Sequence, residues 1–383
     1  MRRLLILASA IIFFDVAFYA AIAPLLPGYV DDLGLSKAQA GILTASYAIG
    51  TLLNSLPAGF VATRLGPRRT VIAGLLLLSG SSVVFGLAGS FGLLVAARFA
   101  QGVSGALTWT GTLSWLVTSA PRSRRGAVIG TALGTAVAGS MLGPPLGALA
   151  SAIGTAPVFA SVAVITLCFA VAAARLPDST ERGSGSVRET LTTFTHRPVL
   201  IAVAMVGVPS LMFGVVGVLI PLRIDDLGGG PFLIAAGFAV GAGLEAILSP
   251  AVGRYSDRSG RLRPYVVGMA ICAVAVLLIP VGQANGIVVS AEVLTAIGAG
   301  FCFTPATAIL SSAAEGEGLH QGFASGLMNM AWAGGQVIGA VGGGSAADVF
   351  GYAVPCIAMA GLLALTALLT SSGALARAEA APG

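Results

Sequence analysis

An internal repeat covers most of the chain and limits the folds that it can adopt. Residues 25–34 read LLPGYVDDLG and residues 219–228 read LIPLRIDDLG, so six of ten positions are identical at an offset of 194. The match continues at offsets of 194 and then 196: Gly59, Arg64, Gly66, Gly130, Gly139, Gly143 and Gly147 pair with Gly253, Arg258, Gly260, Gly326, Gly335, Gly339 and Gly343. Such a duplication predicts two structurally similar halves.

The halves are too apolar for a soluble protein. The chain is 56% hydrophobic and 9% charged, whereas soluble domains have roughly 25% charged residues. Twelve apolar runs are long enough for the helix of about 20 residues that crosses a bilayer. They cover residues 4–28, 38–62, 70–90, 92–118, 126–150, 155–176, 198–222, 230–253, 264–284, 286–313, 322–346 and 351–373. Lipid offers the backbone no partners, so these runs should be helical.

We therefore expect an all-α membrane protein with twelve transmembrane helices in two six-helix bundles related by pseudo-two-fold symmetry. The N-terminal bundle covers residues 1–176 and the C-terminal bundle residues 198–383, joined by a polar cytoplasmic linker at 177–197. The first apolar run carries Asp15 and lacks a suitable cleavage site, which favours a span over a removable signal peptide.

The basic residues predict which side each loop faces. With both termini inside, seventeen of the twenty Lys and Arg residues lie in inner segments, while Lys37 and Arg223 lie outside and Arg98 lies within a span. Cytoplasmic loops carry such an excess of positive charge. The sequence thus predicts a multi-pass protein of the cell inner (plasma) membrane with both termini in the cytoplasm.

Two short loops carry a motif that resembles one known family. Residues 253–263 read GRYSDRSGRLR, and residues 59–69 read GFVATRLGPRR, with Thr63 in place of the acidic residue. They resemble the inner-loop pattern of the major facilitator superfamily, and the resemblance extends over the whole chain. It implies a latch that fastens the halves in one state, although basic loops alone could also serve only to set topology. The latch residues would be Gly59, Arg64, Gly66, Arg68, Gly253, Asp257, Arg258, Gly260 and Arg261.

Two further segments are similar to motifs of exporters in that superfamily. Residues 97–106, ARFAQGVSGA, resemble a motif that places Arg98 within the membrane, and Pro24-x-x-Pro27 closes the first span. The fifth span resembles the antiporter motif through Gly130, Gly139, Gly143, Pro144 and Gly147. These small residues also suit close helix packing without any role in export.

Two acidic residues lie near the middle of spans, where a charge is costly and marks a functional site. Asp15 and Glu245 are candidate proton-coupling residues, and Arg98 is expected to contact Asp15 directly or through water. Glu292, near the outer start of its span, is expected at the membrane interface. The candidate substrate cavity contains Tyr47, Asn54, Gln101, Thr108, Trp109, Asn329, Trp332 and Gln336.

The sequence predicts a transporter and no enzyme. It has no phosphate-binding Gly-Lys loop, and the spacing of its four cysteines and two histidines predicts no metal site, so we expect no cofactor. The resemblance implies a monomeric, proton-coupled exporter of small hydrophobic or amphipathic compounds that contacts lipid and no nucleic acid. A sugar, amino-acid or other metabolite transporter of the same fold and a non-transporting membrane sensor remain alternatives.

Overall fold

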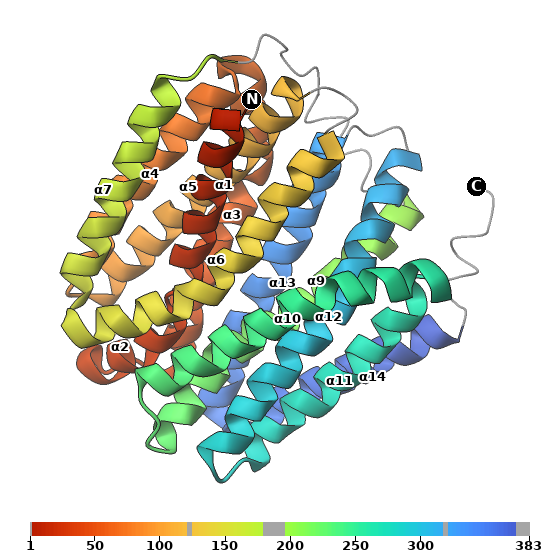
Figure 1. Cartoon of the computed structure of the whole chain (residues 1–383). Coiled ribbons are helices and arrows are strands. Elements are labelled where there is room, and N and C mark those ends of the chain that lie inside the picture. Colours follow the sequence, from red (N-terminus) through yellow and green to blue (C-terminus); the bar gives the residue numbers. More distant parts are fainter. Residues whose placement is uncertain (1, 121–124, 179–195, 317–320, 373–383) are drawn as a thin grey trace.

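The computed structural model describes residues 2–120, 125–178, 196–316 and 321–372, and most of the predicted linker lies outside these ranges. The described elements are all helical (Figure 1). They are α1 (Arg2–Ala20), the 3₁₀ helix η1 (Ala23–Leu25), α2 (Leu26–Leu33), α3 (Lys37–Leu65), α4 (Pro67–Gly86), α5 (Phe91–Ser119), α6 (Arg125–Ile153), α7 (Thr155–Ala174), α9 (Arg197–Asp226), α10 (Pro231–Ser259), α11 (Leu262–Val281), α12 (Asn285–Gly316), α13 (Gln321–Phe350) and α14 (Ala353–Ser371).

These helices confirm the predicted all-helical, twelve-segment fold. The pieces α1, η1 and α2 form one broken segment, and eleven long helices follow it. Ten of the twelve described segments are long and apolar enough to cross a bilayer, and the two others are α3 and α13. Those two helices pack against each other between the N-terminal half (α1–α7) and the C-terminal half (α9–α14), which explains why they tolerate more polar residues.

The repeated glycines end helices at equivalent places in the two halves. Gly34 and Gly228 follow the repeated segment with φ of 61° and 75°, and Gly66 and Gly260 follow α3 and α10 with φ of 88° and 84°. Side chains rarely adopt positive φ, whereas glycine does so without steric cost. The part of the repeat that lies in loops therefore specifies where helices stop.

The glycines of the antiporter-like motif let α6 approach α1. A Cβ atom on these residues would collide with carbonyl oxygens of α1 and of the residue that follows it: Gly139 with Phe13, Gly143 with Ala17 and Gly147 with Ala21. In the C-terminal half α13 packs on α9 in the same way, since Gly335 and Gly339 face the carbonyl oxygens of Gly207 and Leu211. Gly130 has open space beside it. Three of the four motif glycines are therefore packing positions.

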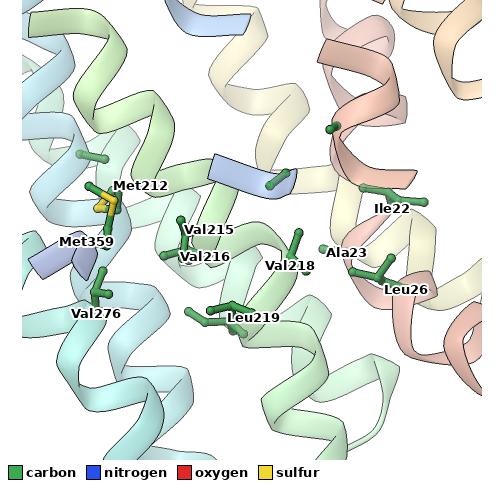
Figure 2. Close-up of a cluster of buried hydrophobic side chains, with 14 of the residues drawn as sticks. Ile22, Ala23, Leu26, Met212, Val215, Val216, Val218, Leu219, Val276 and Met359 are labelled. Atoms are coloured by element: carbon green, nitrogen blue, oxygen red, sulfur yellow. The ribbon is translucent and has the colours of Figure 1, made fainter. Parts of the chain in front are cut away.

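Apolar contacts join the halves near the break in the first segment. Figure 2 shows Ile22, Ala23 and Leu26 facing Val218 of α9, within a buried cluster that continues to Met359 of α14. At the same end Gly41 of α3 packs against Ala340 and Gly344 of α13. We call the end of the molecule that carries the turns at Gly34, Gly228 and Gly351 the distal end. The end that carries the start of α1 is the terminal end (Figure 1).

Candidate functional site

Asp15 is a buried carboxylate in α1, near the middle of the molecule. Its side chain is 6% exposed, and Oδ1 has no hydrogen-bond partner among the described residues. The Thr108 hydroxyl of α5 interacts electrostatically with the carboxylate and lies 3.1 Å from each of the Ser104 and Gly105 carbonyl oxygens. A buried, under-partnered acid in a membrane protein is a site where charge can be gained or lost.

Tyr47 of α3 lies beside Asp15 because α5 has glycines where the two helices meet. A side chain on Gly102 would collide with the Tyr47 backbone, and one on Gly105 would collide with the Tyr47 hydroxyl. A Cβ atom on Gly105 would also lie 3.6 Å from Asp15 Oδ2. The segment ARFAQGVSGA thus clears the space in which the Tyr47 hydroxyl and the Asp15 carboxylate lie near each other.

Arg98 of α5 is 1% exposed, and it donates a hydrogen bond to a carbonyl group next to the break in the first segment. Nη1 donates to Gln101 Oε1 at 3.1 Å, and Nη2 donates to the Tyr19 carbonyl oxygen at 3.3 Å. The helical hydrogen bonds of α1 stop where η1 begins at Ala23, and Pro24 has no N–H to offer. The last carbonyl groups of α1 therefore need other donors, and Arg98 supplies one.

Arg98 forms no direct ion pair with Asp15 among the described residues, and a contact through water stays a prediction. Helical side chains lean toward the N-terminus of their own helix, and α5 begins at the distal end, so the Arg98 side chain points away from the centre. Its guanidinium carbon lies 5.1 Å from the ring centre of Tyr47, while Asp15 lies near the hydroxyl of that residue. Tyr47 therefore lies near both charged groups, which form no ion pair with each other among the described residues.

An aromatic bridge links this site to the C-terminal half. The ring centres of Tyr19 and Tyr47 are 4.8 Å apart, and those of Tyr19 and Trp332 are 5.4 Å apart in an edge-to-face arrangement. Trp332 comes from α13, so the bridge crosses between the halves. Tyr19 was not among the predicted site residues. Its position four residues after Asp15, on the same face of α1, is the signal that could have found it.

The remaining predicted cavity residues lie outside this group of contacts. Asn54 donates to the Gly50 carbonyl oxygen of its own helix at 3.1 Å, and Trp109 packs in a second apolar cluster with residues of α1, α4 and α7. On α13, Gln336 is buried and Asn329 is half-buried. The structure thus joins Tyr47, Gln101, Thr108 and Trp332 to Asp15 and Arg98, and it does not join the other four.

The other predicted acid, Glu245, lies in the C-terminal half with Glu292. Glu245 is half-buried on α10, and its Cγ lies 3.1 Å from where a Cβ on Gly300 of α12 would stand. Glu292 is 4% exposed, so it is buried between helices, and its expected position near the membrane interface stays a prediction. That expectation counted residues from the end of α12, whereas the packing of α10 over α12 decides the burial.

The loop-motif residues contact their own halves in this structure. Arg68 donates to the Leu176 carbonyl oxygen at 2.9 Å and lies 3.8 Å from an oxygen of Asp178. Arg261 donates to Ser312 Oγ at 2.8 Å. The Arg64 guanidinium stacks over the Phe60 ring, Arg258 is exposed, and the side chain of Asp257 lies outside the described part of the structure. The predicted latch function stays a prediction.

At the distal end a polar cluster joins the halves instead. The Lys37 backbone N–H donates to Asp348 Oδ1 at 3.0 Å, and the Lys37 ammonium group lies over the ring of Tyr352. The Tyr352 hydroxyl donates to Asp226 Oδ2 at 2.6 Å. The Arg223 guanidinium carbon is 5.5 Å from the same ring. We call these five residues the distal cluster; none of them was assigned to a site from the sequence.

The described residues offer no site for a metal ion, since no group of three or more His, Cys, Asp or Glu side chains comes together among them. Within the same ranges the four cysteines are unpaired, and three of them are buried. The site is thus a set of charged, hydroxyl and aromatic side chains placed between two helical halves.

The chain belongs to the Major Facilitator Superfamily, whose sequence profile matches residues 5–315 and 210–378. Proteins of this family that the chain resembles include ones named as transporters. The chain is similar to the MFS-type transporter ppzB of Metarhizium majus, with 34% identity over 126 residues. It is also similar to the quinolone resistance protein NorA of Staphylococcus aureus, with 28% identity over 109 residues. These alignments cover 31% and 28% of this chain, and 27% and 28% of the two relatives.

A solved structure has the same fold over the whole chain. It is a bacterial homolog of the human lysosomal transporter Spinster, in an inward-facing and unoccupied conformation. The TM-score is 0.76 at 14% identity, and the match covers 98% of this chain and 96% of the other. At that identity the likeness concerns the fold alone, and the substrate must be argued from the site.

Proposed function

We propose that the protein is a proton-coupled exporter of small hydrophobic or amphipathic compounds. The observation that carries this proposal is a buried carboxylate, Asp15, beside an aromatic bridge that spans both halves. Tyr19, Tyr47 and Trp332 offer flat apolar faces, which suit aromatic or aliphatic solutes better than sugars. The similarity to ppzB and NorA supports a branch of the superfamily that includes a quinolone resistance protein.

The surroundings of Asp15 suit both of its protonation states. The hydroxyl groups of Tyr47 and Thr108 can donate a hydrogen bond to a carboxylate or accept one from a carboxylic acid. Arg98 is occupied by Gln101 and Tyr19, so a proton is the cation that would neutralise Asp15 in this state. A solute that displaces Tyr19 or Tyr47 would disturb both charged groups at once, which is a route for coupling.

Alternating access follows from contacts at the distal end. The distal cluster, the Gly41–Gly344 contact and the apolar cluster around Ile22 hold that end closed. The basic loops Arg64–Arg69 and Arg254–Arg263 lie at the terminal end, which we assign to the cytoplasm of a cell with an inner membrane. The state described is then closed on the outer side, and rocking of residues 1–176 against residues 198–383 about Asp15 would open that side.

A dye efflux assay in a pump-deficient bacterial host tests this function. Cells that produce the protein should expel ethidium, an aromatic cation, and a protonophore should stop the efflux. The expected growth phenotype is resistance to several aromatic compounds. Efflux that continues at full rate after the protonophore collapses the proton gradient would contradict proton coupling. A panel that finds transport of sugars or amino acids and no dye would favour the metabolite alternative.

A further inference from the structure

The seam between α10 and α12 holds a carboxylate that the proposed mechanism does not use. Glu292 is 4% exposed, and its Oε2 has no hydrogen-bond partner among the described residues. It takes part in no ion pair within that part of the chain. An ionised carboxylate left without a partner inside a membrane protein is costly, so a buried acid of this kind needs a cation.

The chemistry around Glu292 leaves a proton as that cation. The charged side chain that interacts electrostatically with Glu292 is another acid, Glu245. Arg223 of α9 instead donates to the Gly282 carbonyl oxygen at the distal end, and on α11 the groups that face α12 are Cys272 and Tyr265. In the sequence, the other basic residues of this half fall in or beside the loops at the terminal end or in the C-terminal tail. None of these neighbours offers Glu292 a positive charge.

Small residues let α10 and α12 pack closely along this seam. A Cβ on Gly237 of α10 would stand 4.0 Å from Glu292 Cγ, and one on Gly241 would stand 3.0 Å from the Ala296 side chain. Further along, Gly300 of α12 leaves room for the Glu245 side chain. A Cβ atom on Gly300 would lie 3.1 Å from Glu245 Cγ. The two acids therefore lie on one shared helix–helix seam and are separated by glycine and alanine.

The two acids lie at different depths. Glu292 is seven residues after Asn285, the first residue of α12, or about 10 Å from the distal end at 1.5 Å per residue. Glu245 is 14 residues from either end of α10, or about 21 Å deep. Glu245 is half-buried in this state, whereas Glu292 is sealed. Glu292 thus lies between the distal surface and Glu245.

We propose that Glu292 is a second proton-binding residue, which exchanges protons with the distal side and is coupled electrostatically to Glu245 on the same α10–α12 seam. This inference rests on the proposed proton-coupled function. When the distal end opens, water on that side gives a proton to the Glu292 carboxylate. Neutralising Glu292 removes a negative charge that acts on Glu245, so Glu245 then releases its own proton more readily, toward the terminal end after the distal end closes.

Infrared spectroscopy of the full-length protein in liposomes tests the inference without a substrate. The carbonyl stretch of buried carboxylic acids should include a component that Glu292→Gln removes and Glu292→Asp retains at a shifted frequency. Thr295→Val is the matched control, because Thr295 is buried on the same helix and bonds the Ala291 carbonyl oxygen. The control should keep the component. In Glu245→Gln the titration midpoint of the Glu292 component should move, since the two acids interact.

Ethidium transport driven by a pH gradient in the same liposomes gives a second measurement. We expect Glu292→Gln to lower proton-driven ethidium transport at least tenfold, Glu292→Asp to restore part of it, and Thr295→Val to remain near the wild-type rate. An infrared spectrum that Glu292→Gln leaves unchanged would overturn the inference, as would wild-type transport by that variant. A wild-type protein that shows the infrared component but no proton-driven transport would contradict the proposed function and leave the proton site at Glu292 standing.

Discussion

The ammonium group of Lys37 lies 4.0 Å from the ring centre of Tyr352, in the other half of the molecule. Lys37 begins α3, and Tyr352 directly precedes α14. The Tyr352 hydroxyl continues the contact to Asp226 at the end of α9. This arrangement ties the start of α3 to the ends of two C-terminal helices, from which α3 must separate if the distal end opens. The strength of the contact should therefore set the balance between the two states.

Substituting Lys37 should shift the protein toward a state with an open distal end. A cation over an aromatic ring contributes about 1 kcal/mol, so Lys37→Met should raise the ratio of open to closed protein about fivefold. Spin labels on Ser90→Cys and Gln283→Cys, both exposed, would report the distance across the distal end by electron–electron double resonance in a Cys168→Ser background. Lys37→Arg keeps a cation at this site and should behave like the wild type, and an unchanged distance distribution in Lys37→Met would rule out a latch role.

The distal cluster should also respond to alkaline pH. Burial raises the pKa of Tyr352 well above its usual range, and the bond to Asp226 raises it further, while Arg223 acts in the opposite direction. If Tyr352 is exposed in the open state, it would ionise there near pH 10. The closed state should then be unaffected below pH 10 and lose about 1.4 kcal/mol per pH unit above it. Tyr352→Phe should abolish this dependence in the same distance measurement, and a dependence that survives Tyr352→Phe must arise elsewhere.

Two neighbouring glycines of α13 should differ sharply in their tolerance of a methyl group. A Cβ on Gly339 would collide with the Leu211 carbonyl oxygen of α9, whereas Gly342 has open space around it. Overpacking a tight contact costs about 1–3 kcal/mol, so Gly339→Ala should lower the melting temperature of the purified protein by several degrees. Gly342→Ala should leave it unchanged or raise it slightly because alanine favours helix. Equal melting temperatures would mean that α9 and α13 can move apart freely.

Arg98 should not be replaceable by lysine. Two separate nitrogens of its guanidinium group reach Gln101 and the Tyr19 carbonyl oxygen, and a single ammonium group lacks that fork. Leaving either buried acceptor unpaired costs about 1–3 kcal/mol, so Arg98→Lys should lower ethidium transport roughly tenfold or more. Arg254→Lys, at an exposed position, is the control and should transport normally. Full activity in Arg98→Lys would mean that charge alone matters at this position.

The sequence predicted what periodicity and composition determine. The twelve helical segments and the duplication of the chain follow from patterns along the sequence. The partner of Arg98 did not follow, because it depends on a carbonyl group freed by the helix break at Pro24. The sequence also could not show that Lys37 meets Asp348, since 311 residues separate them.

Buried acids illustrate the same limit. Distance from a helix end placed Glu292 at the membrane interface, yet the glycines of α10 let that helix cover it. Tyr19 could have been found from its spacing to Asp15, whereas Trp332 was predicted on α13 without any indication that it would meet Tyr19. Contacts between the halves depend on how the halves dock, which the pattern within one helix does not encode.

Flux driven by a pH gradient, compared between the wild type and Asp15→Asn, tests the central claim most directly. The protein would be placed in liposomes and the accumulation of ethidium followed after a pH step, with Asp32→Asn as the control because Asp32 is an exposed acid of the same segment. One pH unit supplies about 1.4 kcal/mol, enough for about a tenfold gradient. We predict that the wild type and Asp32→Asn accumulate ethidium against its gradient while Asp15→Asn only equilibrates it. Uphill accumulation by Asp15→Asn at the wild-type rate would contradict the assignment of Asp15 as the coupling residue.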